Sequence, residues 1–299
     1  MTIQDYAREF ERQLKLRNNA DSTIQTYIGM MRQFLLHCKN DPRAITVRMV
    51  EDYLLTLKST AYKKQMIFTL QNFYANVLKM PSYLAEVPIP KKEKFIPEIL
   101  NVDEVYSLIQ SIPNLKQRTV IQLIYACALR IGETVNIRVK DIDGKRKVLA
   151  IRQAKGAKDR LVPIPDDTLT LLREYYKQYK PKEFLFEGQC APQYDVRSIQ
   201  QVFYRAKDKA GIRKKVSVHS LRHSRATHLV DNGVDMSMIQ KFLGHSNIKT
   251  TVDFYLHTSI VSMQNIFARV DSSISNSSMA FKSGNQIEQN QVHILSSKI

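Results

Sequence analysis

The chain has 299 residues, 45 of them Lys or Arg and 28 Asp or Glu, and its formal net charge is +17. Hydrophobic residues make up 43% and charged residues 24% of it, which suits folded domains and excludes disorder over most of the length. No stretch approaches the roughly 20 apolar residues that cross a bilayer, and the N-terminus lacks the apolar core of a signal peptide. We therefore expect a cytoplasmic protein without a membrane partner.

The surplus positive charge is spread along the chain. Residues 1–97 carry a net charge of +6 and residues 98–270 one of +11, whereas residues 271–299 are neutral. A surplus on two folded regions is typical of proteins that bind a long polyanion, and nucleic acid is the usual candidate. Charge alone leaves ribosomal, membrane-surface and ordinary soluble proteins open.

Helical periodicity dominates the first ninety residues, where apolar residues form four stripes with steps of three and four. The stripes are Tyr6, Phe10 and Leu14; Tyr27, Met30, Met31, Phe34 and Leu35; Val50, Tyr53, Leu54 and Leu57; and Leu70, Phe73, Tyr74 and Val77. We expect a four-helix bundle over residues 1–88. The segment that begins at Asp21 is predicted to cap the second helix, and Asp41 with the following proline to break the chain before the third.

Four prolines lie between Pro81 and Pro97, together with a lysine-rich cluster. Proline interrupts regular helix, so this stretch is predicted to be an extended connector, with the linker proper at residues 89–97. A basic linker could follow a phosphate backbone, and a solvated hinge explains the same residues equally well.

A second domain is expected over residues 98–270. A helix is predicted to begin at residues 102–104, and the nearly all-apolar run at residues 120–129 predicts a buried helix that ends at Arg130. After a short hairpin, the chain is predicted to be mostly helical again.

The hairpin is predicted from two β-rich runs at residues 147–152 and 159–164, with Gly156 in the turn. The fold class is therefore mainly α, with an N-terminal four-helix bundle and an α+β second domain that contains a small antiparallel sheet. Residues 271–299 are rich in Ser, Asn and Gln and are predicted to form a polar tail.

Five basic residues and one tyrosine of the second domain stand in short motifs along the chain. Arg130 lies in A-L-R-I-G-E, Lys155 in A-K-G-A-K, His219 and Arg222 in H-S-L-R-H-S-R-A-T-H-L, His245 in F-L-G-H-S, and Tyr255 in T-T-V-D-F-Y-L-H. Each motif alone is weak, because such residues usually serve structure. Their ordered series resembles the tyrosine recombinase family, also called the phage integrase family, over about residues 98–260. The N-terminal bundle is similar to the family's core-binding domain.

This resemblance implies a site-specific recombinase that cleaves and rejoins DNA strands through a 3′-phosphotyrosyl intermediate, with no cofactor, metal ion or ATP. Its partners would be double-stranded recombination sites, further copies of the chain in a synaptic homo-tetramer, and accessory directionality factors. The architecture is like that of Xer proteins and integron integrases. Integration or excision of a mobile element and resolution of chromosome dimers both stay open as roles.

The phosphate-binding residues follow from the chemistry of the reaction. Attack on a phosphodiester builds negative charge on its non-bridging oxygens, and the guanidinium groups of Arg130 and Arg222 can bind a phosphate in bidentate fashion. His245 can donate a third hydrogen bond. Glu133 matches an acidic position of the family and is expected to orient Arg130 through a buried ion pair, with an ordinary surface carboxylate as the alternative.

The residues that move protons and form the ester complete the predicted site. Tyr255 offers a phenol with a pKa of about 10 that can become a phosphate ester. His219 would take up its proton or orient the phosphate. Lys155 is the general acid that the resemblance implies for the leaving 5′-oxygen, and Lys158 is a rival that we expect to contact backbone phosphate instead.

Two alternative functions remain at this point, a catalytically idle DNA-binding relative and a type IB topoisomerase that relaxes supercoils. The complete set of catalytic residues argues against the first, and the compact two-domain size against the second. Several histidines near the site carry no metal-binding spacing such as H-E-x-x-H. Beyond the proposed nucleophile, Met263, Ile266, Phe267 and Val270 stand at helical spacing and are expected to pack on their own or a neighbouring protomer.

Overall fold

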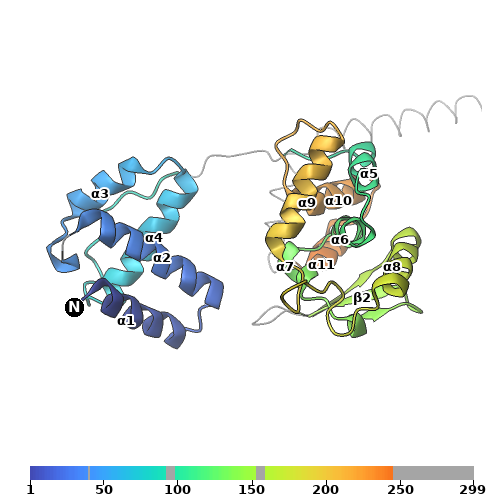
Figure 1. Cartoon of the computed structure of the whole chain (residues 1–299). Coiled ribbons are helices and arrows are strands. Elements are labelled where there is room, and N and C mark those ends of the chain that lie inside the picture. Colours follow the sequence, from blue (N-terminus) through green and yellow to red (C-terminus); the bar gives the residue numbers. More distant parts are fainter. Residues whose placement is uncertain (40, 92–97, 153–158, 245–299) are drawn as a thin grey trace, which may run out of the picture. The chain divides into compact units, whose positions relative to one another are not determined.

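A computed structural model of the chain describes residues 1–39, 41–91, 98–152 and 159–244. The chain divides into two compact units, Met1–Phe95 and Ile96–Ile299 (Figure 1). Both are mainly helical, and the second also contains a small antiparallel sheet, which confirms the predicted fold class. In the part of the chain that the structure covers, no helix combines the length and the apolar character that a membrane span requires.

The first unit contains the four predicted helices. They are α1 (Ile3–Leu16), α2 (Asp21–Cys38), α3 (Val47–Thr56) and α4 (Thr60–Asn76), with the short 3-10 helix η1 (Pro42–Ala44) before α3. The side chains of Thr2, Thr46 and Ser59 accept hydrogen bonds from backbone N–H groups in the first turns of α1, α3 and α4, as N-caps do. The predicted cap of α2 is wrong. Ala20 occupies that position and Asp21 is already helical, so its charge faces the positive end of the helix instead.

The apolar stripes of the four helices meet in one core. Phe10, Phe34 and Phe73 are fully buried there, and the rings of Phe10 and Phe73 meet edge to face with centroids 5.5 Å apart. Leu84 and Val87 belong to the same core, so the chain just after Pro81 is not an extended connector. These residues turn back onto the bundle because they can bury apolar side chains in it.

The second unit surrounds the buried helix α6 (Leu115–Ala126). Helices α5, α7, α8, α9 and α10 all pack against α6, and α10 also packs against α11. Their bounds are α5 (Val102–Gln110), α7 (Ile131–Val135), α8 (Asp166–Tyr179), α9 (Val196–Lys209), α10 (Val218–Asp231) and α11 (Met236–Leu243). In Figure 1 the sheet lies beside α8.

The predicted end of the buried helix is wrong. Helix α6 ends at Ala126 rather than at Arg130, because Ala128 adopts a left-handed backbone conformation with a φ of 48°. The three residues that follow the helix are buried in a loop although they are apolar enough to continue it. Arg130 therefore lies at the N-cap position of the next helix, α7.

The sheet has three antiparallel strands in the order β1-β2-β3. They are β1 (Ile142–Asp143), β2 (Val148–Ile151) and β3 (Arg160–Pro163). The β2–β3 pair confirms the predicted hairpin, with Ile151 opposite Arg160 at the end nearest to the turn. Strand β1 was not predicted, since two residues are too few to show a period of two.

Helix α10 is anchored in its middle and in its last turn. The hydroxyl of Ser224 accepts a hydrogen bond from the Leu100 N–H at 2.9 Å, and Nδ1 of His228 lies 2.9 Å from the hydroxyl of Tyr125 on α6. His228 therefore has a structural role. The anchored α10 positions the two predicted site residues in its first turns.

Candidate active site

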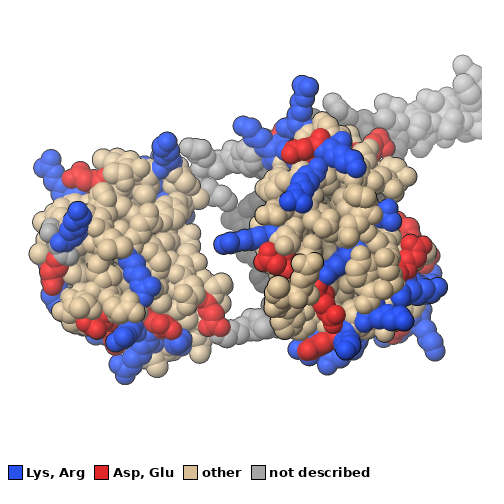
Figure 2. Space-filling view, in the orientation of Figure 1, with Lys and Arg blue, Asp and Glu red and all other residues tan. Residues whose placement is uncertain are grey.

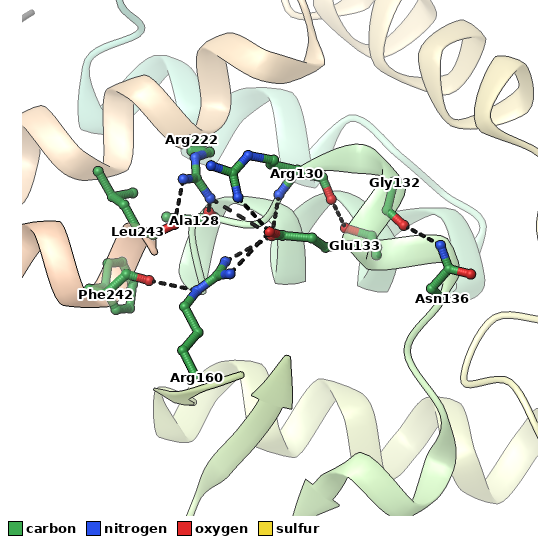
Figure 3. A network of polar contacts seen from close by, with 10 residues as sticks. Ala128, Arg130, Gly132, Glu133, Asn136, Arg160, Arg222, Phe242 and Leu243 are labelled. Carbon is green, nitrogen blue, oxygen red and sulfur yellow. Dashed lines mark hydrogen bonds and ion pairs between the residues drawn. The ribbon is translucent and has the colours of Figure 1, made fainter. Parts of the chain in front are cut away.

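Arg222 is the most deeply buried of the predicted site residues. Its side chain is 2% exposed, and it comes from α10. Nη1 donates to the carbonyl oxygen of Ala128 and Nη2 to that of Leu243, each at 2.6 Å. Both carbonyls belong to segments where a helix ends, so the guanidinium satisfies buried acceptors that the helices leave open. These contacts hold Arg222 rigidly beside α7 and α11 (Figure 3).

Glu133 lies at the centre of the site. Its Oε1 accepts from Nη1 of Arg130 at 2.7 Å and its Oε2 from the Arg130 backbone N–H at 2.9 Å, while Nη1 of Arg222 lies 3.8 Å from Oε2. The Glu133 side chain is 9% exposed and that of Arg130 is 39% exposed. The contact with Arg130 and the low exposure of Glu133 confirm the predicted buried ion pair and exclude an ordinary surface carboxylate. The structure thus brings Arg130 and Arg222 to the same carboxylate.

A third arginine, which is not among the predicted site residues, binds the same carboxylate. Nη1 and Nη2 of Arg160 donate to Oε1 and Oε2 of Glu133 at 3.0 and 2.8 Å, and its Nε donates to the carbonyl oxygen of Phe242 at 3.0 Å. The Arg160 side chain is 7% exposed. Its signal in the sequence is a charged residue two positions before the buried Val162 on β3, which places both side chains on the same face of the strand.

Arg160 and Arg130 keep Glu133 ionised. Burial acts to raise the pKa of this carboxyl, but the hydrogen bonds from the Arg160 side chain and the Arg130 backbone, with the charge of Arg160, outweigh it and lower the pKa to about 2. Each carboxylate oxygen thus accepts charge-assisted hydrogen bonds. At neutral pH the four side chains carry a net charge of +2, which suits an anionic ligand such as a phosphodiester.

His219 lies one turn before Arg222 on α10, and its side chain is exposed. Partial desolvation by the surrounding protein, followed by the positive charges of Arg222 and Arg130, lowers its pKa below the ordinary 6.5, although the charge of Glu133 acts in the opposite direction. A neutral imidazole is the form expected at neutral pH, and this form can accept a proton. The ring meets that of His223 edge to face, with centroids 4.5 Å apart.

Three predicted site residues, Lys155, His245 and Tyr255, lie outside the described residues, as do Lys158 and the apolar stripe that begins at Met263. Of the predicted catalytic residues, the structure therefore describes Arg130, His219 and Arg222. It brings Arg130 and Arg222 together at Glu133 and places His219 close enough to feel their charges. Within residues 1–39, 41–91, 98–152 and 159–244, no three His, Cys, Asp or Glu side chains gather in a way that would hold a metal ion.

Comparison with known proteins identifies the family. The family model described as "Phage integrase family" matches residues 98–260, and that of the phage integrase N-terminal SAM-like domain matches residues 7–82. A tyrosine recombinase of Thermosipho africanus is 34% identical over 82% of this chain and 91% of its own. The tyrosine recombinase XerA of Thermococcus onnurineus is 32% identical over 83% of this chain and 89% of its own.

Solved structures agree with this match. The chain is similar to a crystal structure of XerA recombinase, with a TM-score of 0.55, 26% identity and coverage of 89% of this chain and 98% of that one. A lambda integrase dimer bound to a core site shares the fold, with a TM-score of 0.69, 18% identity and coverage of 84% and 97%. The chain belongs to the phage integrase family, and it is a tyrosine recombinase, an enzyme of site-specific DNA recombination.

Proposed function

We propose that Arg130 and Arg222 bind the scissile phosphate of double-stranded DNA. The observation that carries this proposal is their convergence on Glu133, which holds two guanidinium groups from different helices in one place. A preorganised pair of cations stabilises the charge that develops on the non-bridging oxygens as the phosphorus becomes pentavalent. The exposed fraction of Arg130 gives a phosphate access to its guanidinium.

Tyr255 is the nucleophile in this proposal. Its hydroxyl oxygen forms a bond to phosphorus while the bond from phosphorus to the 5′-oxygen breaks, which leaves a 3′-phosphotyrosyl link and a 5′-hydroxyl. A 5′-hydroxyl of another strand reverses the step and restores a phosphodiester. Because the ester conserves the energy of the original bond, no ATP is consumed.

Proton transfers accompany both bond changes. His219 accepts the phenolic proton or orients the phosphate, which its lowered pKa supports, because the imidazole is neutral at the pH of the reaction. Lys155 donates a proton to the leaving 5′-oxygen, and His245 donates a hydrogen bond to a non-bridging oxygen. These roles rest on the match of the chain to the family at those positions.

The wider partners are proposed on charge and similarity. Lysine and arginine side chains project from both units, with acidic ones among them (Figure 2), and the net charge of the chain is +17, so both units can contact backbone phosphate. Residues 1–88 would act as the core-binding domain and residues 98–270 as the catalytic domain. A solved lambda integrase tetramer on a Holliday junction has this fold, and we extend the tetramer and a cytoplasmic location to this chain. Directionality factors stay an expectation of the resemblance.

The decisive experiment is the detection of a covalent protein–DNA adduct. The substrates are nicked suicide duplexes taken from the DNA that flanks the gene, in which loss of the 5′ fragment prevents religation. With wild-type protein and no added metal, we expect a protease-sensitive adduct on a denaturing gel.

The matched variant is Tyr255→Phe, which removes a single oxygen atom. It should bind the same duplex as tightly as the wild type and form no adduct. An adduct in this variant would refute Tyr255 as the nucleophile. Tight binding by the wild type without an adduct would favour the idle DNA-binding alternative, and relaxation of plasmids of any sequence would favour the topoisomerase.

A further inference from the structure

We propose that Arg160 is a positioning residue of the cleavage reaction, which aligns the phosphate-binding arginines through Glu133. This inference deepens the proposed function and rests on it. Arg160 belongs to β3, five residues after Lys155 in the sequence, whereas Glu133 belongs to α7 and Phe242 to α11. One side chain therefore joins three elements of the catalytic unit (Figure 3).

The first step of the argument concerns how Glu133 is shared. Arg160 binds both oxygens of the carboxylate in the parallel geometry that arginine and carboxylate prefer. Without it, Arg130 and Arg222 would face the whole negative charge of a buried carboxylate. Arg160 compensates much of that charge, so the charge of Arg130 can act on the DNA. The orientation of Arg130 and its availability to phosphate thus both depend on Arg160.

The second step concerns rigidity. Arg160 is held on its other side by the Phe242 carbonyl in the last turn of α11. Gly244 caps this helix with a φ of 65°, and a Cβ at that position would lie 2.9 Å from Cδ and Nη1 of Arg160. The end of α11 therefore encloses Arg160 closely, and a side chain in place of Gly244 would force the Arg160 side chain to move. Since Arg222 binds the neighbouring Leu243 carbonyl, the two arginines fix the same helix end.

The chain offers a matched control at the other side of the hairpin. Arg152 follows β2, and its Nε donates to Oδ1 of Asp141 at 2.7 Å. Its side chain is 62% exposed, against 7% for Arg160. Both arginines anchor the same end of the β2–β3 strand pair to a buried carboxylate, but only Arg160 contacts Glu133. Arg152→Gln thus removes a hairpin anchor and leaves the arginine cluster intact.

The test measures single-turnover adduct formation at saturating DNA, for full-length variants whose circular dichroism at the assay temperature equals that of the wild type. Arg160→Gln should lower the rate by roughly 10- to 100-fold, as small misplacements of catalytic groups do, without weakening DNA binding. Arg160→Lys keeps the positive charge but lacks the two parallel N–H donors, and its rate should lie between those of Arg160→Gln and the wild type. Should Arg160→Gln fail to fold, Arg160→Lys carries the test.

A double variant separates positioning from a general loss of structure. If Arg160 acts through Glu133, then the double variant Arg160→Gln with Glu133→Gln should cleave no more slowly than the slower of the two single variants. Independent, multiplying losses would overturn the proposal, as would wild-type rates in both Arg160 variants or an equal loss in Arg152→Gln. If the wild type forms no adduct, the proposed function is refuted and this inference with it. If the wild type forms an adduct and both Arg160 variants form it at the same rate, only this inference is refuted.

Discussion

Replacement of Glu133 by glutamine should destabilise the catalytic unit by an amount that depends on pH. The pKa of Glu133 is about 2 in the folded protein, against an ordinary value of 4.5. At about 1.4 kcal/mol per pKa unit, the ionised carboxylate contributes roughly 3 kcal/mol to the free energy of unfolding at pH 7. Removal of one partner of a buried ion pair costs a similar amount, about 3–5 kcal/mol.

The pH dependence follows from the sign of the shift. Because the pKa is lowered on folding, the contribution is complete above pH 4.5 and disappears as the pH falls through about 2. The difference between the wild type and Glu133→Gln should therefore shrink by about 2 kcal/mol between pH 7 and about pH 3. Glu183→Gln is the control, because Glu183 pairs with Arg138 on the surface and should change the stability by less than about 1 kcal/mol.

Scanning calorimetry can follow this effect in the full-length chain. The transition of the catalytic unit is assigned with a variant of the other unit, such as Phe73→Ala, which should shift a different transition. A difference between the wild type and Glu133→Gln that is below 1 kcal/mol at pH 7, or that stays constant down to pH 3, would refute the view that the arginines keep Glu133 ionised.

Two further predictions concern other parts of the molecule. Phe73→Ala removes a fully buried ring from the bundle core and should destabilise the first unit by about 3–5 kcal/mol in urea unfolding. The unfolding transition of the second unit should stay in place. A shift of both transitions would contradict the presence of two separate cores. The pKa of His219 is lowered from the ordinary 6.5, so as the pH falls the rate of adduct formation should begin to decline at a lower pH than an ordinary imidazole would give. His219→Asn should abolish that decline, and a wild-type rate that already drops above pH 7 would contradict the lowered pKa.

The first unit and the hairpin were predictable because their periodicity is strong and local. Four apolar stripes specify four helices, and two β-rich runs around a glycine specify a hairpin. The end of α6 was not predictable in this way. The apolar run continues past Ala126, and the helix stops because Ala128 takes a left-handed conformation that the buried Arg222 then secures by binding its carbonyl.

The site itself was predictable only in part. The pairing of Glu133 with Arg130 could be inferred because Glu133, three residues after Arg130, matches an acidic position of the family that the motifs resemble. Arg160 could not, because its partner is 27 residues away in the sequence and only the folded sheet brings β3 to α7. The neighbouring Leu161 is 57% exposed although Val162 is buried, so Leu161 faces outward while the charged Arg160 faces inward beside Val162, opposite to the usual pattern for these two residue types.

The contacts of Arg222 bear on how sequences of this family are compared. Its guanidinium serves two buried carbonyls that lie far apart in the chain, so its removal would damage folding even in a protein with no reaction to perform. A descendant that had lost recombination would still be under selection to keep an arginine here. Retention of Arg222 in a distant sequence therefore reports on the integrity of the fold, and the more exposed Arg130 is the better marker of a working enzyme.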